Sequence, residues 1–129
     1  MNSYTKKIKD TTYTVTLFNA VTGLAIARKL SSILASTKVI PYLDTSETID
    51  KLIEYDSDLS LTLELLSNTL VDGKAIEREN FNKLFTGKLG EYIEILMFVV
   101  ETNFADFFYT IKAQLEKFQK NETKVDQAE

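Results

Sequence analysis

The sequence predicts a mainly α protein: a single helical domain that begins with a short β-hairpin and ends in a long helix. Three observations support this fold class. The first residues alternate with a period of two, apolar residues recur at helical spacing through most of the remainder, and 129 residues is a common size for one domain with one core. The 44% hydrophobic and 26% charged fractions are typical of a globular protein. One domain over residues 1–118 and a mobile polar tail over residues 119–129 are therefore expected.

A β-hairpin is expected over residues 4–18. Tyr13, Val15 and Leu17 alternate with threonines, and a period of two in Thr, Tyr and Val is typical of strands. The chain is expected to reverse near Lys9–Thr11, although this turn contains no glycine.

A helix is expected over residues 20–36, after which the chain continues as a linker. Asn19 stands where an N-cap belongs, because its side-chain oxygen can accept a hydrogen bond from the first turn. Apolar residues recur behind it at helical spacing. Pro41, the only proline, disfavours the α conformation in the residue before it and marks the linker.

Residues 46–70 predict helix with one break. Polar residues at Asp44–Glu47 can cap a first segment, and Asp56–Asp58 can cap a second one whose leucines share a face. A calcium loop starting at Asp56 would need glycine and glutamate where Leu61 and Ser67 stand, so a helix cap is the better interpretation.

Residues 71–76 form a turn around Asp72-Gly73, and two interpretations remain open. The turn makes a small hairpin, or it connects two helices. A short helix over residues 78–85 follows, with Phe81 and Phe85 on its apolar face.

A long helix is expected over residues 88–118, with a bend near Asn103. Its apolar residues fall on one side at 100° per residue. They are Leu89, Ile93, Leu96, Val100, Phe104, Phe107, Ile111 and Phe118.

Composition excludes several classes of function. The net charge of −4 gives no electrostatic footprint for nucleic acid. Histidine and cysteine are absent, which removes imidazole and thiolate catalysis and the usual ligands of transition metals. The longest apolar run, Ile95–Val100, is too short to cross a bilayer, and the first ten residues lack the apolar core of a secretory signal. We therefore expect a soluble cytoplasmic protein without cofactor or metal.

No motif predicts catalysis. Gly87-Lys88 does not make a phosphate loop, because Asn82 and Leu89 occupy the places that need glycine and Ser or Thr. Glu91, Glu94 and Glu101 could act as paired carboxylates in an enzyme, but an outer face of solvated charges is the better interpretation.

Phe98 is the residue that the apolar stripe does not explain. On the helical wheel it lies among acidic residues, across the helix from the stripe and next to Ile95. Burial of the helix on both sides is the favoured interpretation, because a domain of this size often has a central helix. Exposure of Phe98 and Ile95 to a partner is the alternative.

Two segments carry a family resemblance. They read Phe-Thr-Gly-Lys-Leu-Gly-Glu at residues 85–91 and Val-Val-Glu-Thr-Asn-Phe-Ala-Asp-Phe-Phe at residues 99–108. This pattern resembles the tail assembly chaperones of long-tailed bacteriophages, and a looser likeness extends over residues 4–110. The resemblance implies a non-enzymatic factor that binds the tape measure protein in the host cytoplasm and is absent from the finished virion. It also implies a longer, frameshifted form that engages the tail tube protein.

Apolar side chains are the expected contacts of such a chaperone, since amphipathic client helices are held in apolar grooves. Self-association is left open. The alternative to a chaperone is a small structural or adaptor subunit that stays in the tail. The partner-binding candidates are Phe81, Phe85, Ile95, Phe98, Phe104, Phe107 and Phe108.

Overall fold

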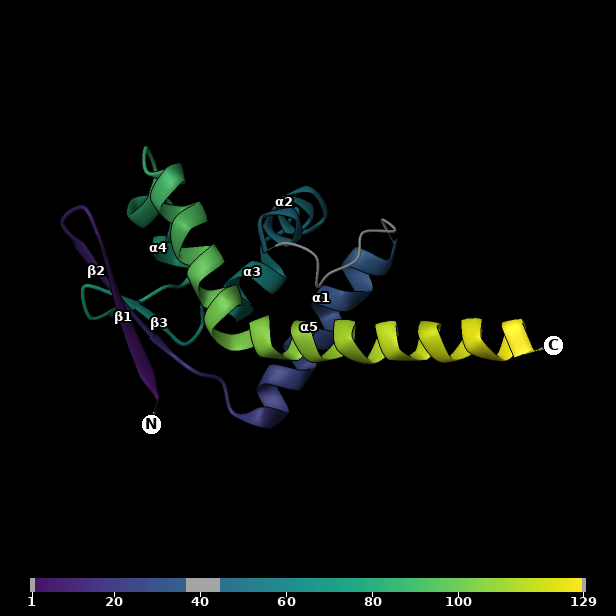
Figure 1. The fold of residues 1–129 in the computed structure, drawn as a ribbon. Helices are drawn as coiled ribbons and strands as arrows, with labels where there is room; N and C mark the ends of the chain where they lie inside the picture. Colours follow the sequence, from purple (N-terminus) through teal and green to yellow (C-terminus); the bar gives the residue numbers. More distant parts are fainter. Residues whose placement is uncertain (1, 37–44, 129) are drawn as a thin grey trace.

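The structure, a computed structural model, describes residues 2–36 and 45–128 (Figure 1). The expected linker around Pro41 lies outside the described residues. The elements in chain order are β1 (Ser3–Ile8), β2 (Thr11–Thr16), α1 (Ala20–Ser36), α2 (Thr45–Tyr55), α3 (Ser60–Leu65), β3 (Thr69–Val71), β4 (Lys74–Ala75), α4 (Arg78–Phe85) and α5 (Leu89–Ala128).

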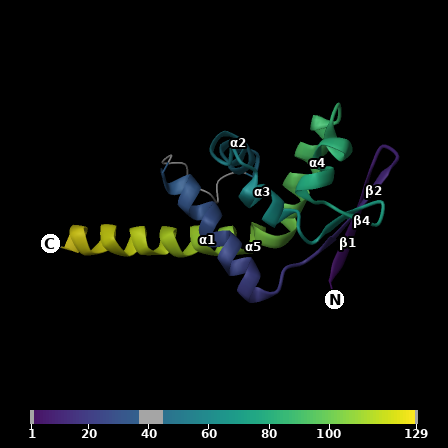
Figure 2. The same cartoon turned by 180° about the vertical axis from the view of Figure 1, so that it is seen from behind.

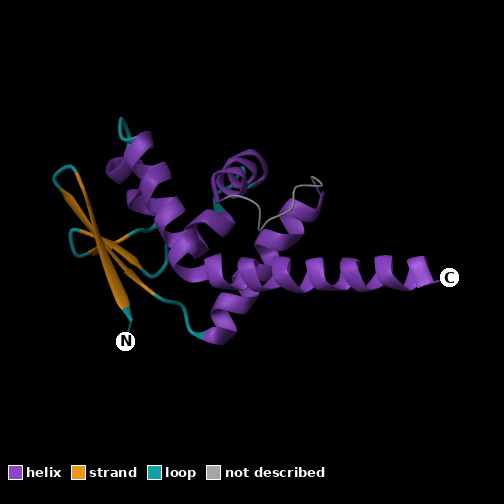
Figure 3. Ribbon diagram, in the orientation of Figure 1, coloured by secondary structure: helices purple, strands orange, loops and turns teal. Residues whose placement is uncertain are grey.

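The predicted fold class was wrong, because the protein is a mixed α and β structure and not a mainly α domain with one hairpin. The four strands form one antiparallel sheet in the order β1-β2-β3-β4. Strand β2 pairs with β3 in a register that places Tyr13 opposite Val71. The second hairpin therefore extends the first one, and Figure 3 shows all strands gathered at one end of the molecule.

The helix predicted over residues 46–70 ends earlier than expected, at Leu65. The reason is the tight turn at Asp72-Gly73, where both residues have positive φ angles of 50° and 83° and reverse the chain into β4. Asp72 also fixes this turn to the first hairpin, because its Oδ1 accepts a hydrogen bond from the Thr12 amide at 2.9 Å. Of the two interpretations of residues 71–76, the small hairpin is the one observed.

The other elements begin where the sequence predicts. Helix α1 coincides with the predicted range of 20–36, and the amide of Thr22 donates to Asn19 Oδ1 at 2.8 Å, as expected of an N-cap. Helix α4 coincides with the predicted 78–85, and α5 begins one residue after the predicted start.

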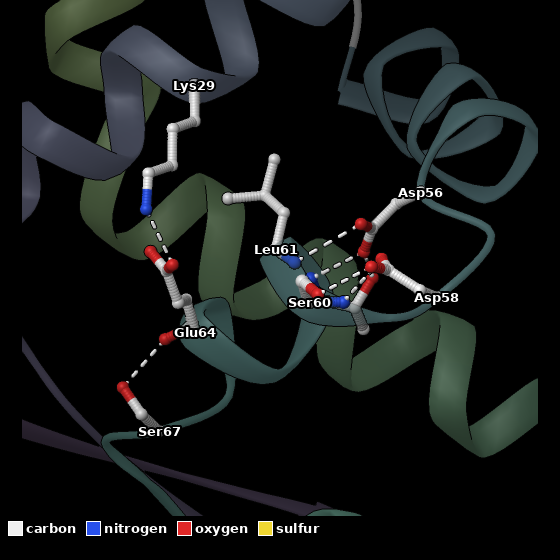
Figure 4. A network of polar contacts seen from close by, with 8 residues as sticks. Lys29, Asp56, Asp58, Ser60, Leu61, Glu64 and Ser67 are labelled. Atoms are coloured by element: carbon white, nitrogen blue, oxygen red, sulfur yellow. Dashed lines mark hydrogen bonds and ion pairs between the residues drawn. The ribbon is translucent and has the colours of Figure 1, made fainter.

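Helix α3 is capped by Asp56 and Asp58 (Figure 4), in agreement with the cap predicted there. The buried Asp56 carboxylate accepts hydrogen bonds from the Leu61 amide at 3.2 Å and from the Thr62 amide and hydroxyl at 2.7 Å. The oxygens of this carboxylate therefore satisfy orphan donors of the first turn. Beside it, Asp58 accepts from the Ser60 amide at 3.1 Å.

The first half of α5 is the centre of the fold and is buried on both sides. Four of its side chains are at most 1% exposed, namely Ile95, Leu96, Val99 and Val100. The sheet lies on one side of this half and helices α2 and α3 on the other (Figure 1). Phe98 is half-buried beneath the first hairpin, with Lys6 Nζ 5.4 Å from the centre of its ring. The favoured interpretation of Phe98, burial on both sides, thus agrees with the structure.

Two expectations for the start of α5 were wrong. Leu89, expected in the core stripe, is the first residue of the helix and is 67% exposed. Glu91, expected in solvent, is buried and accepts a hydrogen bond from the Tyr13 hydroxyl at 3.1 Å. Glu94 and Glu101 are exposed as expected.

Helix α5 bends and then extends away from the rest of the fold (Figures 1 and 2). Asn103, where a bend was predicted, donates from Nδ2 to the Val99 carbonyl at 3.1 Å, and such a bond to residue i−4 often accompanies helix bending. The backbone of residues 119–128 continues the helix, and the mobility expected of this tail stays a prediction. The side chain of Phe118 lies outside the described residues.

The Tyr13–Glu91 contact makes the stability pH-dependent. Burial and the bond to the Glu91 carboxylate raise the pKa of Tyr13 from 10.0 to about 12. A raised pKa contributes stability that is complete below pH 10 and is lost as the pH rises toward 12. Replacing Tyr13 by Phe leaves a buried carboxylate without its donor and should cost about 1–3 kcal/mol at neutral pH.

Urea unfolding at several pH values between 7 and 12 measures this effect, with Tyr109→Phe as the control, because Tyr109 is 72% exposed. The stability difference between the wild type and Tyr13→Phe should be largest below pH 10 and shrink above it. Equal stabilities of the wild type and Tyr13→Phe across this pH range would contradict the assigned contact.

Candidate functional site

An apolar groove of about 310 Å³ lies between α1 and α5. The two helices contact each other and cross in both views of the ribbon (Figures 1 and 2). The groove is lined by Phe18, Asn19, Ala20, Gly23, Leu24, Ala27, Asn103, Phe104 and Phe107. None of these lining residues is charged, so the groove is suited to apolar side chains of a partner.

The α1 wall of the groove is built from small residues. Ala20, Gly23 and Ala27 follow one another at spacings of three and four, which places them on one face of the helix. A partner backbone can approach closely over such a face. Leu24 stands at its edge and is 49% exposed, and Val21, one turn earlier, is 81% exposed.

The α5 wall is held in place by Asn103. Its Oδ1 accepts a hydrogen bond from the Phe18 amide at 3.1 Å, while its Nδ2 donates to its own helix. The ring of Phe18 stacks on Phe104 with 6.4 Å between centroids and 27° between planes. These contacts join the segment before α1 to α5, so the groove exists before any partner arrives.

Two of the predicted contact residues, Phe104 and Phe107, line this groove. Phe107 is half-buried, whereas Phe104 is only 3% exposed and forms part of the floor. Phe108 is buried beside them, and its ring lies 5.6 Å from the ring of Phe107.

The other predicted contacts lie elsewhere. Phe81 and Phe85 form an aromatic cluster with Tyr92, with ring centroids 5.1–5.5 Å apart. Phe85 and Ile95 are at most 1% exposed, so a partner reaches them only if the fold opens. Phe81 and Phe98 are half-buried. The structure therefore does not bring the seven candidates together on one surface, and their role in binding stays a prediction.

The α1 side of the groove was missed by the sequence analysis. The analysis placed Phe18 in the hairpin and Gly23 and Leu24 in the following helix, and it proposed none of the three as a contact residue. A signal was present, because Gly23 and its neighbouring alanines recur on one helical face and Val21 and Leu24 add apolar area to it.

The described residues offer little for other chemistry. Among them, no group of three His, Cys, Asp or Glu side chains is placed to hold a metal ion. Within the same residues, no helix is long and apolar enough to cross a bilayer. The buried Glu91 serves as the acceptor of the Tyr13 hydroxyl, a contact between the sheet and α5.

Comparison with known proteins supports the family resemblance. Residues 58–119 match the family described as "Phage tail assembly chaperone protein, TAC". No curated protein and no solved structure matches the chain. The matched segment runs from the cap of α3 through the second hairpin and α4 into α5, and it includes the α5 wall of the groove. The predicted resemblance is thus confirmed, and it supports a chaperone role in tail assembly. Residues 58–119, just under half of the chain, are similar to the phage tail assembly chaperone family.

Proposed function

We propose that this protein binds amphipathic helical segments of the tape measure protein in the α1/α5 groove and keeps that protein soluble until the tail tube polymerises. The observation that carries the proposal is the groove itself, which remains open although the aromatic-rich helix beside it is largely buried. In this role the protein is a non-enzymatic binding factor, consistent with its family.

Exposed apolar side chains extend the groove along both helices. On α1, Val21 lies one turn before Leu24 on the same face. On α5, Ile111 follows Phe107 by four residues and is 38% exposed. Contiguous apolar area of this kind tends to mark an interaction site. An amphipathic helix, which presents anchors at i, i+3 or i+4 and i+7, fits such a surface.

The charge of the protein suits a chaperone of an aggregation-prone client. A net charge of −4 favours solubility of the free protein and of the complex, and it disfavours adventitious binding to DNA. Because the lining of the groove is uncharged, the groove favours apolar client segments over charged ones.

Co-expression with the tape measure protein tests the proposal, and Gly23→Leu is the variant of choice. A Cβ at Gly23 would lie 3.8 Å from the Phe18 Cβ, an ordinary contact, so the backbone has room for a Cβ there. The leucine then fills the groove. We expect the wild type to keep the client in the soluble fraction and Gly23→Leu to lose at least half of that effect.

Ser32→Leu is the matched control, since it adds the same side chain at an exposed position of α1 that does not line the groove. Thermal unfolding should place both variants at or above the wild type, because leucine favours helix by several tenths of a kcal/mol relative to serine and more relative to glycine. A client that is equally soluble without the protein or with Gly23→Leu, or that loses as much solubility with Ser32→Leu as with Gly23→Leu, would refute the proposed function.

The protein is proposed to act in the host cytoplasm and to leave the complex before the virion is complete. Mass spectrometry of purified virions should then detect tube and tape measure proteins but no peptide of this chain. Detection of the chain in amounts comparable to the tape measure protein would instead support the structural or adaptor subunit.

A further inference from the structure

A second cleft, of about 360 Å³, lies where the second hairpin meets α4 and the start of α5. It shares no lining residue with the α1/α5 groove. Its lining is polar and consists of Thr11, Tyr13, Val71, Asp72, Lys74, Asn80, Lys83, Leu84 and Lys88.

Three lysines from separate elements converge on this cleft. Lys74 lies on β4, Lys83 in the last turn of α4 and Lys88 immediately before α5. All three are exposed, and the ion pairs found among the described residues involve other lysines, Lys29 and Lys51. An acidic protein thus places three lysines and one carboxylate, Asp72, around one small cavity, which leaves the cavity with an excess of positive charge.

Three other polar side chains of the cleft already have partners. Asp72, its one carboxylate, accepts the Thr12 amide, and the hydroxyl of Tyr13 donates to Glu91. The side-chain amide of Asn80 binds the backbone of its own loop through both ends. The lysine ammonium groups are therefore the charged donors that remain for a ligand, and the Thr11 hydroxyl is a neutral one beside them.

We propose that this cleft binds carboxylate side chains of an acidic polypeptide segment. Ammonium groups carried by three separate elements suit carboxylates that are spaced along a chain. The negative net charge of the protein disfavours a long nucleic acid, whereas a short acidic segment can approach this locally positive site. The proposal concerns a site distinct from the α1/α5 groove and does not depend on the proposed function.

Fluorescence polarisation with a labelled hexaglutamate peptide at low salt tests the site. Each of Lys74→Gln, Lys83→Gln and Lys88→Gln should weaken binding roughly two- to fivefold, as expected for exposed charge pairs. The triple variant should abolish saturable binding. Because these lysines are exposed and make no ion pair among the described residues, the variants should unfold close to the wild-type temperature.

The triple variant Lys7→Gln, Lys9→Gln, Lys117→Gln is the control, because it removes the same charge at exposed positions outside the cleft. Equal loss of binding in the control would show that the peptide follows net charge and would overturn the proposal. Stronger competition by inorganic phosphate than by acetate at equal ionic strength would overturn the carboxylate assignment.

NMR on the wild type gives a second measurement. Addition of the hexaglutamate peptide should change the amide chemical shifts of residues 72–74 and 83–88. Changes that occur only at other residues would refute the proposed site.

Discussion

Enclosure of the first half of α5 is the constraint on which the rest of the structure depends. This segment is apolar around almost its whole circumference, and a helix of that kind must be covered on both sides. The four-stranded sheet covers one side, and helices α2 and α3 cover the other (Figure 3). Contacts such as Tyr13 with Glu91 and Lys6 with Phe98 join the sheet to this helix.

The candidate site arises where that enclosure ends. Beyond Glu101, α5 leaves the sheet and meets α1, whose small residues leave an open groove beside Phe104 and Phe107. Asn103 stabilises this junction through one hydrogen bond to the segment before α1 and one within α5. The same helix therefore supplies the core with one half and a wall of the α1/α5 groove with the next, and the family match includes both parts.

Local patterns predicted what is local in the structure. The N-cap at Asn19, the Asp56 cap and the first hairpin follow from residue types within a few positions of one another. The pairing of β2 with β3 could not be predicted in this way. It joins residues 58 positions apart, such as Tyr13 and Val71, and β3 has only three residues after a leucine-rich helical run. The same reason applies to the groove. Phe107 belongs to an apolar stripe that the sequence shows, whereas Gly23 lines the groove only because α1 crosses α5.

The absence of cysteine allows a direct test of where the partner binds, since an introduced cysteine is the only one in the chain. Val21→Cys, one turn before the groove residue Leu24, and Ile53→Cys, an exposed apolar position on α2, can each carry a photo-crosslinker. With the tape measure protein co-expressed, the groove position should yield a crosslinked product and the α2 position should yield little or none. Crosslinking from Ile53→Cys but not from Val21→Cys would place the partner elsewhere and contradict the account.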